Sequence, residues 1–363
     1  MTVTTEPPAA APPLAPPPRR SAGERARAAL PIVARWAAAL LGAVVVFSAL
    51  IVFKGANPLE VFPDMWLSTF GRPRSVSEIV IAMAPLILAA LAVVVPARAG
   101  MSNVGGEGQV IVGAIAACGV ALATDGTLPG PLVLALMMVA GVAAGAAWAG
   151  VAGVLRLGFQ VNEAVSTLLL NFVALDLLLF LIYQPWRESA AGQPTTPELA
   201  DAAKLPLLTG STVHIGIVLA VLATIAVFLV LRFTRWGFRL SVVGGNAEAA
   251  RRAGMPVPAL LLSALLVGGA LAGLAGVVEY AGVEYKLRPG FGAQIGYVGF
   301  LASWLARHRP VPVLVAAFVF AGLAVAGGSL QLDAQLPAAT VNILTALILM
   351  AVLGFTQRKA RRA

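Results

Sequence analysis

The chain has 363 residues, of which 59% are hydrophobic and only 11% are charged. An ordinary soluble domain carries roughly 25% charged residues, so this composition excludes a water-soluble protein and indicates one that lies in a lipid membrane. The net charge of +9 does not indicate nucleic-acid binding, because membrane proteins concentrate Lys and Arg in their cytoplasmic segments. No nucleic-acid partner is expected.

The first 30 residues are rich in Pro and Ala and carry four arginines just before the first apolar run, namely Arg19, Arg20, Arg25 and Arg27. This composition is typical of a disordered cytoplasmic tail. The apolar run at 31–53 is too long for a signal-peptide core, and no clear cleavage site follows it. It therefore predicts an uncleaved helix whose N-terminus stays in the cytoplasm.

Nine further apolar runs follow, and each predicts a helix because it lacks the two-residue alternation of a membrane β-barrel. They lie near 76–96, 108–122, 130–155, 163–184, 214–233, 260–280, 291–306, 311–330 and 339–355. The runs at 108–122 and 291–306 are short for a full crossing, as in the broken or re-entrant helices of transporters. We expect an all-α, polytopic transmembrane bundle of about ten helices over 31–355, followed by a basic cytoplasmic tail at 356–363.

The distribution of basic residues supports ten crossings with both termini in the cytoplasm. In that topology most of the 25 Lys and Arg residues fall in cytoplasmic segments, as the positive-inside rule requires. If both short runs were re-entrant, eight crossings would remain, and Arg156 and the five arginines between 232 and 252 would lie outside. The eight-crossing alternative is therefore disfavoured.

The segment Asn103-Val-Gly-Gly-Glu107-Gly-Gln109 joins the second and third apolar runs. Its three glycines oppose a regular helix and suit an irregular segment, or a helix start, that lines an aqueous cavity. A helix beginning at Gly108 would direct its free N–H groups toward a substrate oxygen or the Glu107 carboxylate. The alternative is a cytoplasmic turn with Glu107 as an acidic residue of the first helical turn.

A second polar cluster, Asn162-Glu163-Ala-Val-Ser166-Thr167-Leu-Leu-Leu-Asn171, opens the run at 163–184. Glu163, Thr167 and Asn171 are spaced i, i+4, i+8, which places them on one helix face that extends two turns into the apolar run. Polar side chains are costly at membrane depth, so this stripe should face the bundle interior. It could contact a substrate or form only hydrogen bonds between helices.

A third cluster lies in the longest cytoplasmic loop, at 234–259. It comprises Gly244, Gly245, Asn246, Glu248, Ala249, Arg251, Arg252 and Gly254. The pattern predicts a turn and then a short helix, with Glu248 near its start, the two arginines near its end and Gly254 as its stop. Such a helix on the cytoplasmic face suits docking to another protein, although a basic anchoring loop is an alternative.

The sequence contains no set of residues that would make it an enzyme. It has no G-x-x-x-x-G-K-[ST] loop for ATP, and no H-E-x-x-H or spaced Ser/His/Asp set in the apolar runs. His214 and His308 have no second ligand nearby, and the single cysteine, Cys118, cannot form an intrachain disulfide. We expect no catalytic residue, no metal and no cofactor, so any ATP hydrolysis must come from a separate subunit.

The three clusters resemble motifs of the permease subunits of ABC importers of the branched-chain amino acid, ribose and nucleoside class. Residues 103–109 match Asn-x-Gly-x-Glu-Gly-Gln, 162–171 match Asn-Glu-x-x-Ser-Thr-x-x-x-Asn, and 244–254 match Gly-x-Asn-x-x-Ala-Ala-x-x-x-Gly. The resemblance covers about 76–355 and is strongest to permeases for nucleosides and simple sugars. Val104 stands where the family often has Ile, which is a conservative change.

This resemblance implies an importer in a bacterial plasma membrane, with an extracytoplasmic solute-binding lipoprotein, two permease subunits, identical or homologous, and two ABC ATPase subunits. The third cluster would be the coupling helix that docks on the ATPase, and the first two would line or brace the pathway. Nucleosides are the first expected substrate, with ribose-type sugars or branched-chain amino acids as alternatives.

An ion-coupled secondary transporter is the alternative of another class, and it would need ion ligands inside the bundle. Glu107, Glu163 and Asp176 are the acidic residues near membrane depth, because Glu78 and Glu279 are expected at outer helix ends. These scattered carboxylates do not form an ion site in the sequence, which counts against ion coupling.

Overall fold

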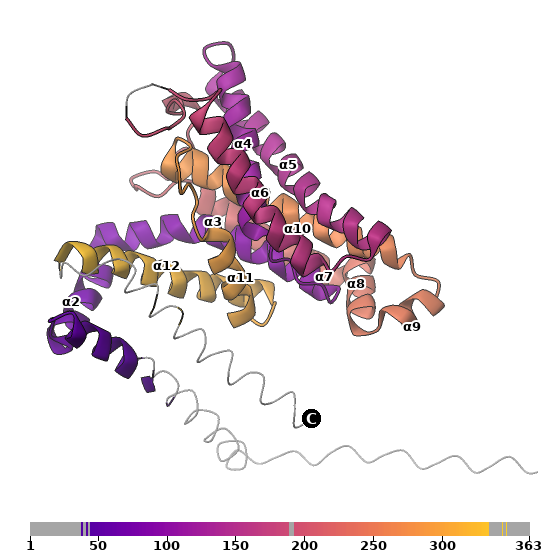
Figure 1. The fold of residues 1–363 in the computed structure, drawn as a ribbon, viewed down its shortest axis with the longest axis horizontal. Coiled ribbons are helices and arrows are strands. Elements are labelled where there is room, and N and C mark those ends of the chain that lie inside the picture. The colour runs from indigo at the N-terminus through magenta and orange to yellow at the C-terminus, as the bar shows by residue number, and fades with distance from the viewer. Residues whose placement is uncertain are drawn as a thin grey trace, which may run out of the picture.

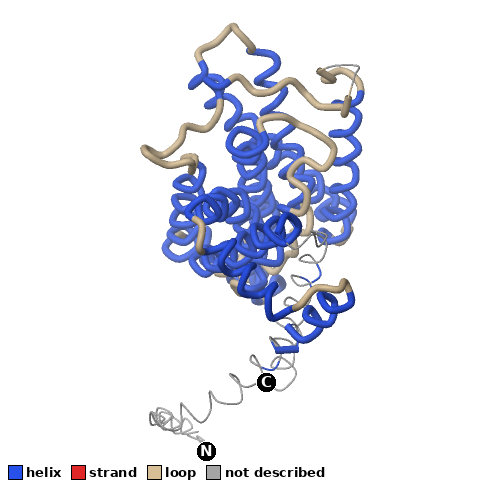
Figure 2. Tube along the Cα trace, turned by 90° about the vertical axis from the view of Figure 1, so that its left-hand side faces the viewer, coloured by secondary structure: helices blue, strands red, loops and turns tan. Residues whose placement is uncertain are grey.

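The computed structural model of the chain describes residues 44–188 and 192–333, together with five isolated positions outside these ranges. Apart from an isolated β-bridge between Leu207 and His214, the regular structure of this part is helical (Figures 1 and 2). The helices are Val44–Phe53, α2 (Pro58–Phe70), α3 (Pro73–Arg98), α4 (Gly106–Thr124), α5 (Gly130–Phe159), α6 (Glu163–Tyr183), η1 (Asp201–Ala203), α7 (Gly216–Phe233), α8 (Arg235–Gly245), α9 (Ala247–Arg252), α10 (Val257–Glu279), the π-helix η2 (Tyr280–Glu284), α11 (Ile295–Leu305) and α12 (Pro310–Asp333).

Seven of these helices are long and apolar enough to cross a membrane, namely α3, α4, α5, α6, α7, α10 with η2, and α12. The count rises to eight if Val44–Phe53 and α2, which meet at 110°, form one broken span. The predicted class, a polytopic helical membrane protein, is confirmed. Apart from the isolated positions 343 and 346, the predicted helix at 339–355 lies outside the described residues, as do the tails at 1–30 and 356–363.

The structure departs from the predicted elements near the N-terminus. It contains α2, which the sequence did not predict. Pro58 occupies the first turn of α2, and the Asn57 side chain caps it by accepting the Leu59 N–H at 3.1 Å. Phe62 of α2 packs on Phe47 with ring centroids 5.9 Å apart. Acidic residues and a second proline interrupt the apolar pattern of α2, which explains why hydropathy alone missed it.

The two runs predicted to be short differ from each other in the structure. Helix α4 has 19 residues and reaches about 28 Å at 1.5 Å per residue, so it is long enough for a full crossing and the prediction of a short helix was wrong. Helix α11 has 11 residues and reaches only about 16 Å, so it is short, as predicted. Residues 285–294, which precede α11, form no regular helix apart from turns.

Helices α3 and α10 form the centre of the bundle. All residues of α3 from 84 to 96 are buried, and α3 contacts α7, α10, α11 and α12. Helix α10 packs on α5 through glycines, so closely that a Cβ atom on Gly273 would lie 2.1 Å from the Gly141 carbonyl oxygen. Backbone contact of this kind is how membrane helices associate without large side chains.

The basic ends of several helices gather at one end of the molecule, at the lower right in Figure 1. The backbone of Gly100, just after α3, lies against Gly244 in α8, and the Ser102 N–H bonds to Glu163 at the start of α6. We call this end of the molecule, where the last turns of α3, α5 and α7 carry Arg98, Arg156 and Arg232, the basic end. At the opposite end, the loop at 192–215 bonds to η2 and the residues after it, including Leu205 N–H to the Ala281 carbonyl at 2.8 Å.

Candidate functional site

Helix α6 presents the predicted polar stripe to the bundle interior. Asn162 caps the helix by accepting the Ala164 N–H at 2.9 Å, and this cap sets where the helix begins. From that start, Glu163, Thr167 and Asn171 fall on one face and are 7%, 1% and 3% exposed. The prediction that the stripe faces inward is confirmed.

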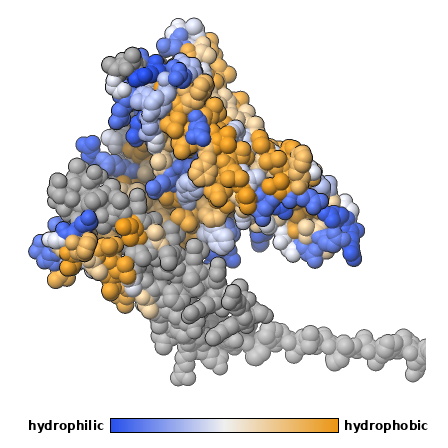
Figure 3. Space-filling view, in the orientation of Figure 1, coloured by the Kyte–Doolittle hydropathy of each residue, from blue (hydrophilic) through white to orange (hydrophobic). Residues whose placement is uncertain are grey.

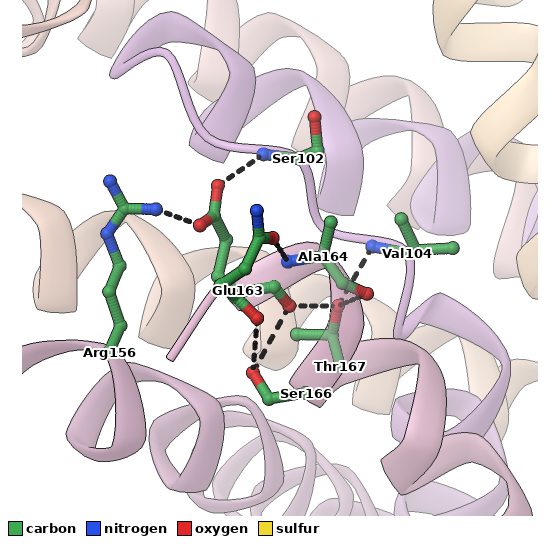
Figure 4. Close-up of polar contacts among 8 residues, drawn as sticks. Ser102, Val104, Arg156, Glu163, Ala164, Ser166 and Thr167 are labelled. Atoms are coloured by element: carbon green, nitrogen blue, oxygen red, sulfur yellow. Dashed lines mark hydrogen bonds and ion pairs between the residues drawn. The ribbon is translucent and has the colours of Figure 1, made fainter. Parts of the chain in front are cut away.

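The stripe binds the irregular backbone that leads into α4 (Figure 4). Glu163 Oε1 accepts the Ser102 N–H at 3.1 Å, and Thr167 Oγ1 accepts the Val104 N–H at 3.2 Å. Asn171 Oδ1 accepts the Gly108 N–H at 2.8 Å. Backbone N–H groups at a helix start have no partner within the helix, and lipid offers none. Successive turns of α6 therefore satisfy donors that would otherwise be buried and unpaired.

This arrangement corrects the predicted role of the start of α4. The helix begins at Gly106 rather than Gly108, and the Gly108 N–H is occupied by Asn171 instead of facing a cavity. Nor does the Glu107 carboxylate bind the N–H groups of its own helix. These groups bind parts of the same protein, so they are not open positions for a substrate oxygen.

Glu107 binds the first residues of the half-length helix α11. Its carboxylate accepts the Gln294 N–H at 2.7 Å, the Gly296 N–H at 2.8 Å and the Tyr297 N–H at 3.4 Å. A negative charge at a helix N-terminus is favourable because the helix dipole is positive there. The backbones touch as well, since a Cβ atom on Gly296 would lie 2.0 Å from the Glu107 nitrogen.

Asn103 and Gln109 hydrogen-bond to each other through both polar atoms of their side-chain amides. Asn103 Nδ2 donates to Gln109 Oε1 and Gln109 Nε2 donates to Asn103 Oδ1, both at 2.9 Å. Asn103 also donates to the Ala92 carbonyl of α3 at 3.2 Å and accepts the Gly105 N–H at 3.1 Å. Both amides are buried, and their contacts fix the segment at 102–108 against α3.

Arg156, near the end of α5, forms an ion pair with Glu163 (Figure 4). Sequence reasoning used this arginine only to test topology and missed the pair, although the two residues flank the same short turn. Ser166, by contrast, bonds only to backbone carbonyls within α6. We use the name junction for the contacts that Asn103, Glu107, Gln109, Glu163, Thr167 and Asn171 make among the segment 102–108, α4, α6 and α11.

The third polar cluster forms the predicted short helix, α9. The Asn246 side chain accepts the Ala249 N–H at 3.0 Å, and Glu248 pairs with Arg251 at 2.9 Å and Arg252 at 3.0 Å. The side chains of these three charged residues are more than half exposed. The helix therefore presents a charged surface whose ion pairs are internal to it.

The ends of this cluster differ from each other. Gly254 has a φ of +76° and ends α9 in the left-handed region, as predicted. Gly244 and Gly245 do not form the predicted turn, because they belong to the last turn of α8. Gly244 packs so tightly on α3 that an added Cβ atom would lie 2.4 Å from the Arg98 carbonyl oxygen.

Two further polar residues are buried at helix ends. Glu279 was expected at an outer helix end and is the last residue of α10. Its side chain is 7% exposed and makes no hydrogen bond or ion pair with the described part of the chain. His214 is buried at the loop end, where its Nδ1 accepts the Gly216 N–H at 3.1 Å and burial lowers its pKa. Among the described residues, no three His, Cys, Asp or Glu side chains are grouped to hold a metal ion.

A bundle of apolar helices long enough to cross a membrane is typical of a multi-pass membrane protein. Residues 75–353 match the family described as "Branched-chain amino acid transport system / permease component". The chain belongs to this family and is a permease of the ABC transporter class.

Characterised relatives cover most of the chain. It is 36% identical over 322 residues to the glucose ABC transporter permease protein TsgB13 of Haloferax volcanii, covering 86% of this chain and 84% of the relative. It is 31% identical to the guanosine ABC transporter permease protein NupP of Bacillus subtilis (84% and 88% covered) and 29% identical to the nucleoside ABC transporter permease protein NupB of Lactococcus lactis (88% and 89%). Each of these organisms has a second similar permease, at 27 to 28% identity.

Proposed function

We propose that the chain is the membrane-spanning subunit of an ATP-driven importer of nucleosides. The observation that carries this proposal is its similarity to NupP and NupB, two relatives named for guanosine and nucleosides, over more than 80% of this chain. Glucose or another simple sugar is the second candidate, favoured by the 36% identity to TsgB13. Branched-chain amino acids are named only in the description of the family.

The proposed machine has ABC ATPase subunits, which α9 engages as the coupling helix through Asn246, Glu248, Arg251 and Arg252. The exposure of these charges and their position at the basic end support this assignment. Gly244 then attaches the coupling helix to α3 through α8. Closure of the ATPase dimer would move α9 and so alternate access to the pathway.

The residues of the first two polar clusters brace the pathway rather than contact the solute. Their hydrogen-bonding groups are bound to other parts of the chain, which supports a bracing role for Asn103, Glu107, Gln109, Glu163, Thr167 and Asn171. Asn162 and Ser166 complete the set by ordering the first turn of α6.

The topology we propose has ten crossings, a permease domain over 31–355 and both termini in the cytoplasm of a bacterium. The basic end is the cytoplasmic face under the positive-inside rule. The bent pair of Val44–Phe53 and α2 counts as one crossing, and the irregular residues 285–294 with α11 count as another. The helix predicted at 339–355 returns the chain to the cytoplasm.

The proposed partners include an extracytoplasmic solute-binding lipoprotein and a second permease subunit. The presence of two similar permeases in each of three organisms favours a second subunit that is homologous rather than identical. Two related chains would then form the passage between them.

Uptake of radiolabelled guanosine, ribose and glucose into cells that express the whole transporter tests this proposal. The matched control is the same transporter with the Walker lysine of its ATPase substituted. We expect guanosine uptake that is lost in the control. ATP-dependent uptake of a sugar alone would change the substrate, and uptake that survives in the control would indicate a secondary transporter instead.

A further inference from the structure

Helix α6 has a second face, opposite the junction, that the described chain leaves uncovered. Asp176 lies on this face and is exposed, whereas the buried face of α6 carries the junction residues. Asp176 is about 20 Å along the helix axis from Glu163 and about 10 Å from Tyr183, at 1.5 Å per residue. The carboxylate therefore lies well inside the span, at the depth of the lipid chains.

Asp176 differs from the other acidic residues of the described spans. Glu107 and Glu163 are bonded within the junction, Glu279 is buried, and Glu78 lies near the start of α3 beside Arg74 at 3.2 Å. Asp176 makes no hydrogen bond or ion pair with the described part of the chain. A charged side chain within a transmembrane span faces the protein interior or a water-filled cavity rather than lipid.

Two aromatic side chains flank Asp176 on the same face. Phe172 precedes it by four residues and Phe180 follows it by four, so all three lie along one stripe of the helix. The phenylalanines are 57% and 60% exposed. The surface over α5 and α6 is mostly hydrophobic in Figure 3. A carboxylate between two exposed phenyl rings combines a hydrogen-bond acceptor with surfaces on which a planar group can stack.

This combination matches a solute that has a planar aromatic base and a hydroxyl-bearing sugar. Bases stack on aromatic side chains, and an ionised carboxylate accepts hydrogen bonds from hydroxyl groups. A simple sugar would use the carboxylate but would gain little from the phenyl rings. The stripe therefore favours a nucleoside over a monosaccharide.

We infer that Phe172, Asp176 and Phe180 line an aqueous passage between this chain and the second permease, and that they contact the nucleoside as it crosses. This inference rests on the proposed function. The junction holds the opposite face of α6 against α4, and so turns this stripe outward toward the passage.

Thiol labelling of the assembled transporter tests whether water reaches the stripe. In a Cys118→Ala background, Asp176→Cys and the matched Val139→Cys are treated with a membrane-impermeant charged methanethiosulfonate. Val139 lies on α5, is 67% exposed and belongs to a purely apolar stretch. We expect Asp176→Cys to react about tenfold faster or more and to be protected by guanosine. Equally slow reaction at both positions would mean that lipid or the second permease covers Asp176, and would overturn the inference.

Transport by the intact complex tests whether the stripe contacts the solute. We expect Asp176→Leu and Phe172→Ala to raise the KM for guanosine about tenfold, with unchanged amounts of assembled complex. Val139→Ala is the control and should behave as wild type. A wild-type KM in both variants would refute the contact.

The two proposals fail in different ways. If the wild-type transporter takes up no nucleoside, the proposed function fails whatever the variants do. If it takes up guanosine but the variants keep a wild-type KM and Asp176→Cys stays unlabelled, only the inference about the stripe fails. Should Phe172→Ala impair sugar uptake as much as guanosine uptake, base stacking is excluded as the role of the ring.

Discussion

The junction and the α9 segment are built from the same residue types, yet they use them differently. Both combine asparagine, glutamate and glycine with an arginine nearby. In the junction the polar atoms are buried and bind backbone groups of other elements, as Glu107 does with α11. In α9 they are exposed and bind one another within a single helical turn. The same side chains thus lock helices together in one place and leave a surface available in the other.

The largest expected difference in stability is between alanine substitutions of a glycine in each of the two regions. Gly296→Ala places a Cβ atom 2.0 Å from the Glu107 nitrogen, whereas a Cβ on Gly245, in the last turn of α8, meets nothing within 4 Å. We expect Gly296→Ala to lower the free energy of unfolding by about 3 kcal/mol. Thermal denaturation of the purified protein should show Gly245→Ala unchanged. Equal stability of the two variants would contradict the close packing of α4 and α11.

The second effect concerns buried hydrogen bonds. Asn171→Leu removes the acceptor of the Gly108 N–H and the donor to the Val104 carbonyl. We expect a loss of about 1–3 kcal/mol, because buried backbone groups are left unpaired. Asn171→Asp keeps the acceptor and should recover part of the stability. If Asn171→Leu unfolds like wild type but transports poorly, the side chain contacts solute instead of bracing the helix.

A third prediction compares the coupling energies of two ion pairs. Double-mutant cycles on Arg156 with Glu163 and on Arg252 with Glu248 measure the two coupling energies under the same conditions. We expect about 1 kcal/mol for the first pair, whose carboxylate is buried, and about 0.3–0.5 kcal/mol for the exposed pair. Added salt should weaken the second pair more than the first. The opposite order would mean that the junction gains nothing from burial of Glu163.

The smallest effect on stability belongs to α9, where the functional effect is expected to be the largest. Glu248→Ala combined with Arg251→Ala removes the two exposed ion pairs of Glu248, so the free energy of unfolding should change by no more than about 0.5 kcal/mol. Solute-stimulated ATP hydrolysis by the whole transporter should nevertheless be abolished. Normal stimulation in the double variant would refute α9 as the coupling helix.

Local patterns in the sequence predicted much of this molecule. Long apolar runs predicted all seven spans with approximately correct bounds, since a run of about 20 apolar residues is itself sufficient to cross a membrane. The i, i+4 spacing predicted the buried face of α6. The acidic start, the two arginines at the end and the stop at Gly254 predicted α9. In each case the residues that determine the structure lie within a few positions of one another.

Only the tertiary structure decided what the polar residues bind. Glu107 and Gly296 are separated by 189 positions, and Asn171 and Gly108 by 63. No local pattern predicts that side chains of α6 will accept hydrogen bonds from the backbone at the start of α4 and just before it. Nor does any local pattern predict that Glu279 is buried and Asp176 exposed. Those outcomes depend on how whole helices pack against each other, and the free energy of that packing is shared among many contacts distant in sequence.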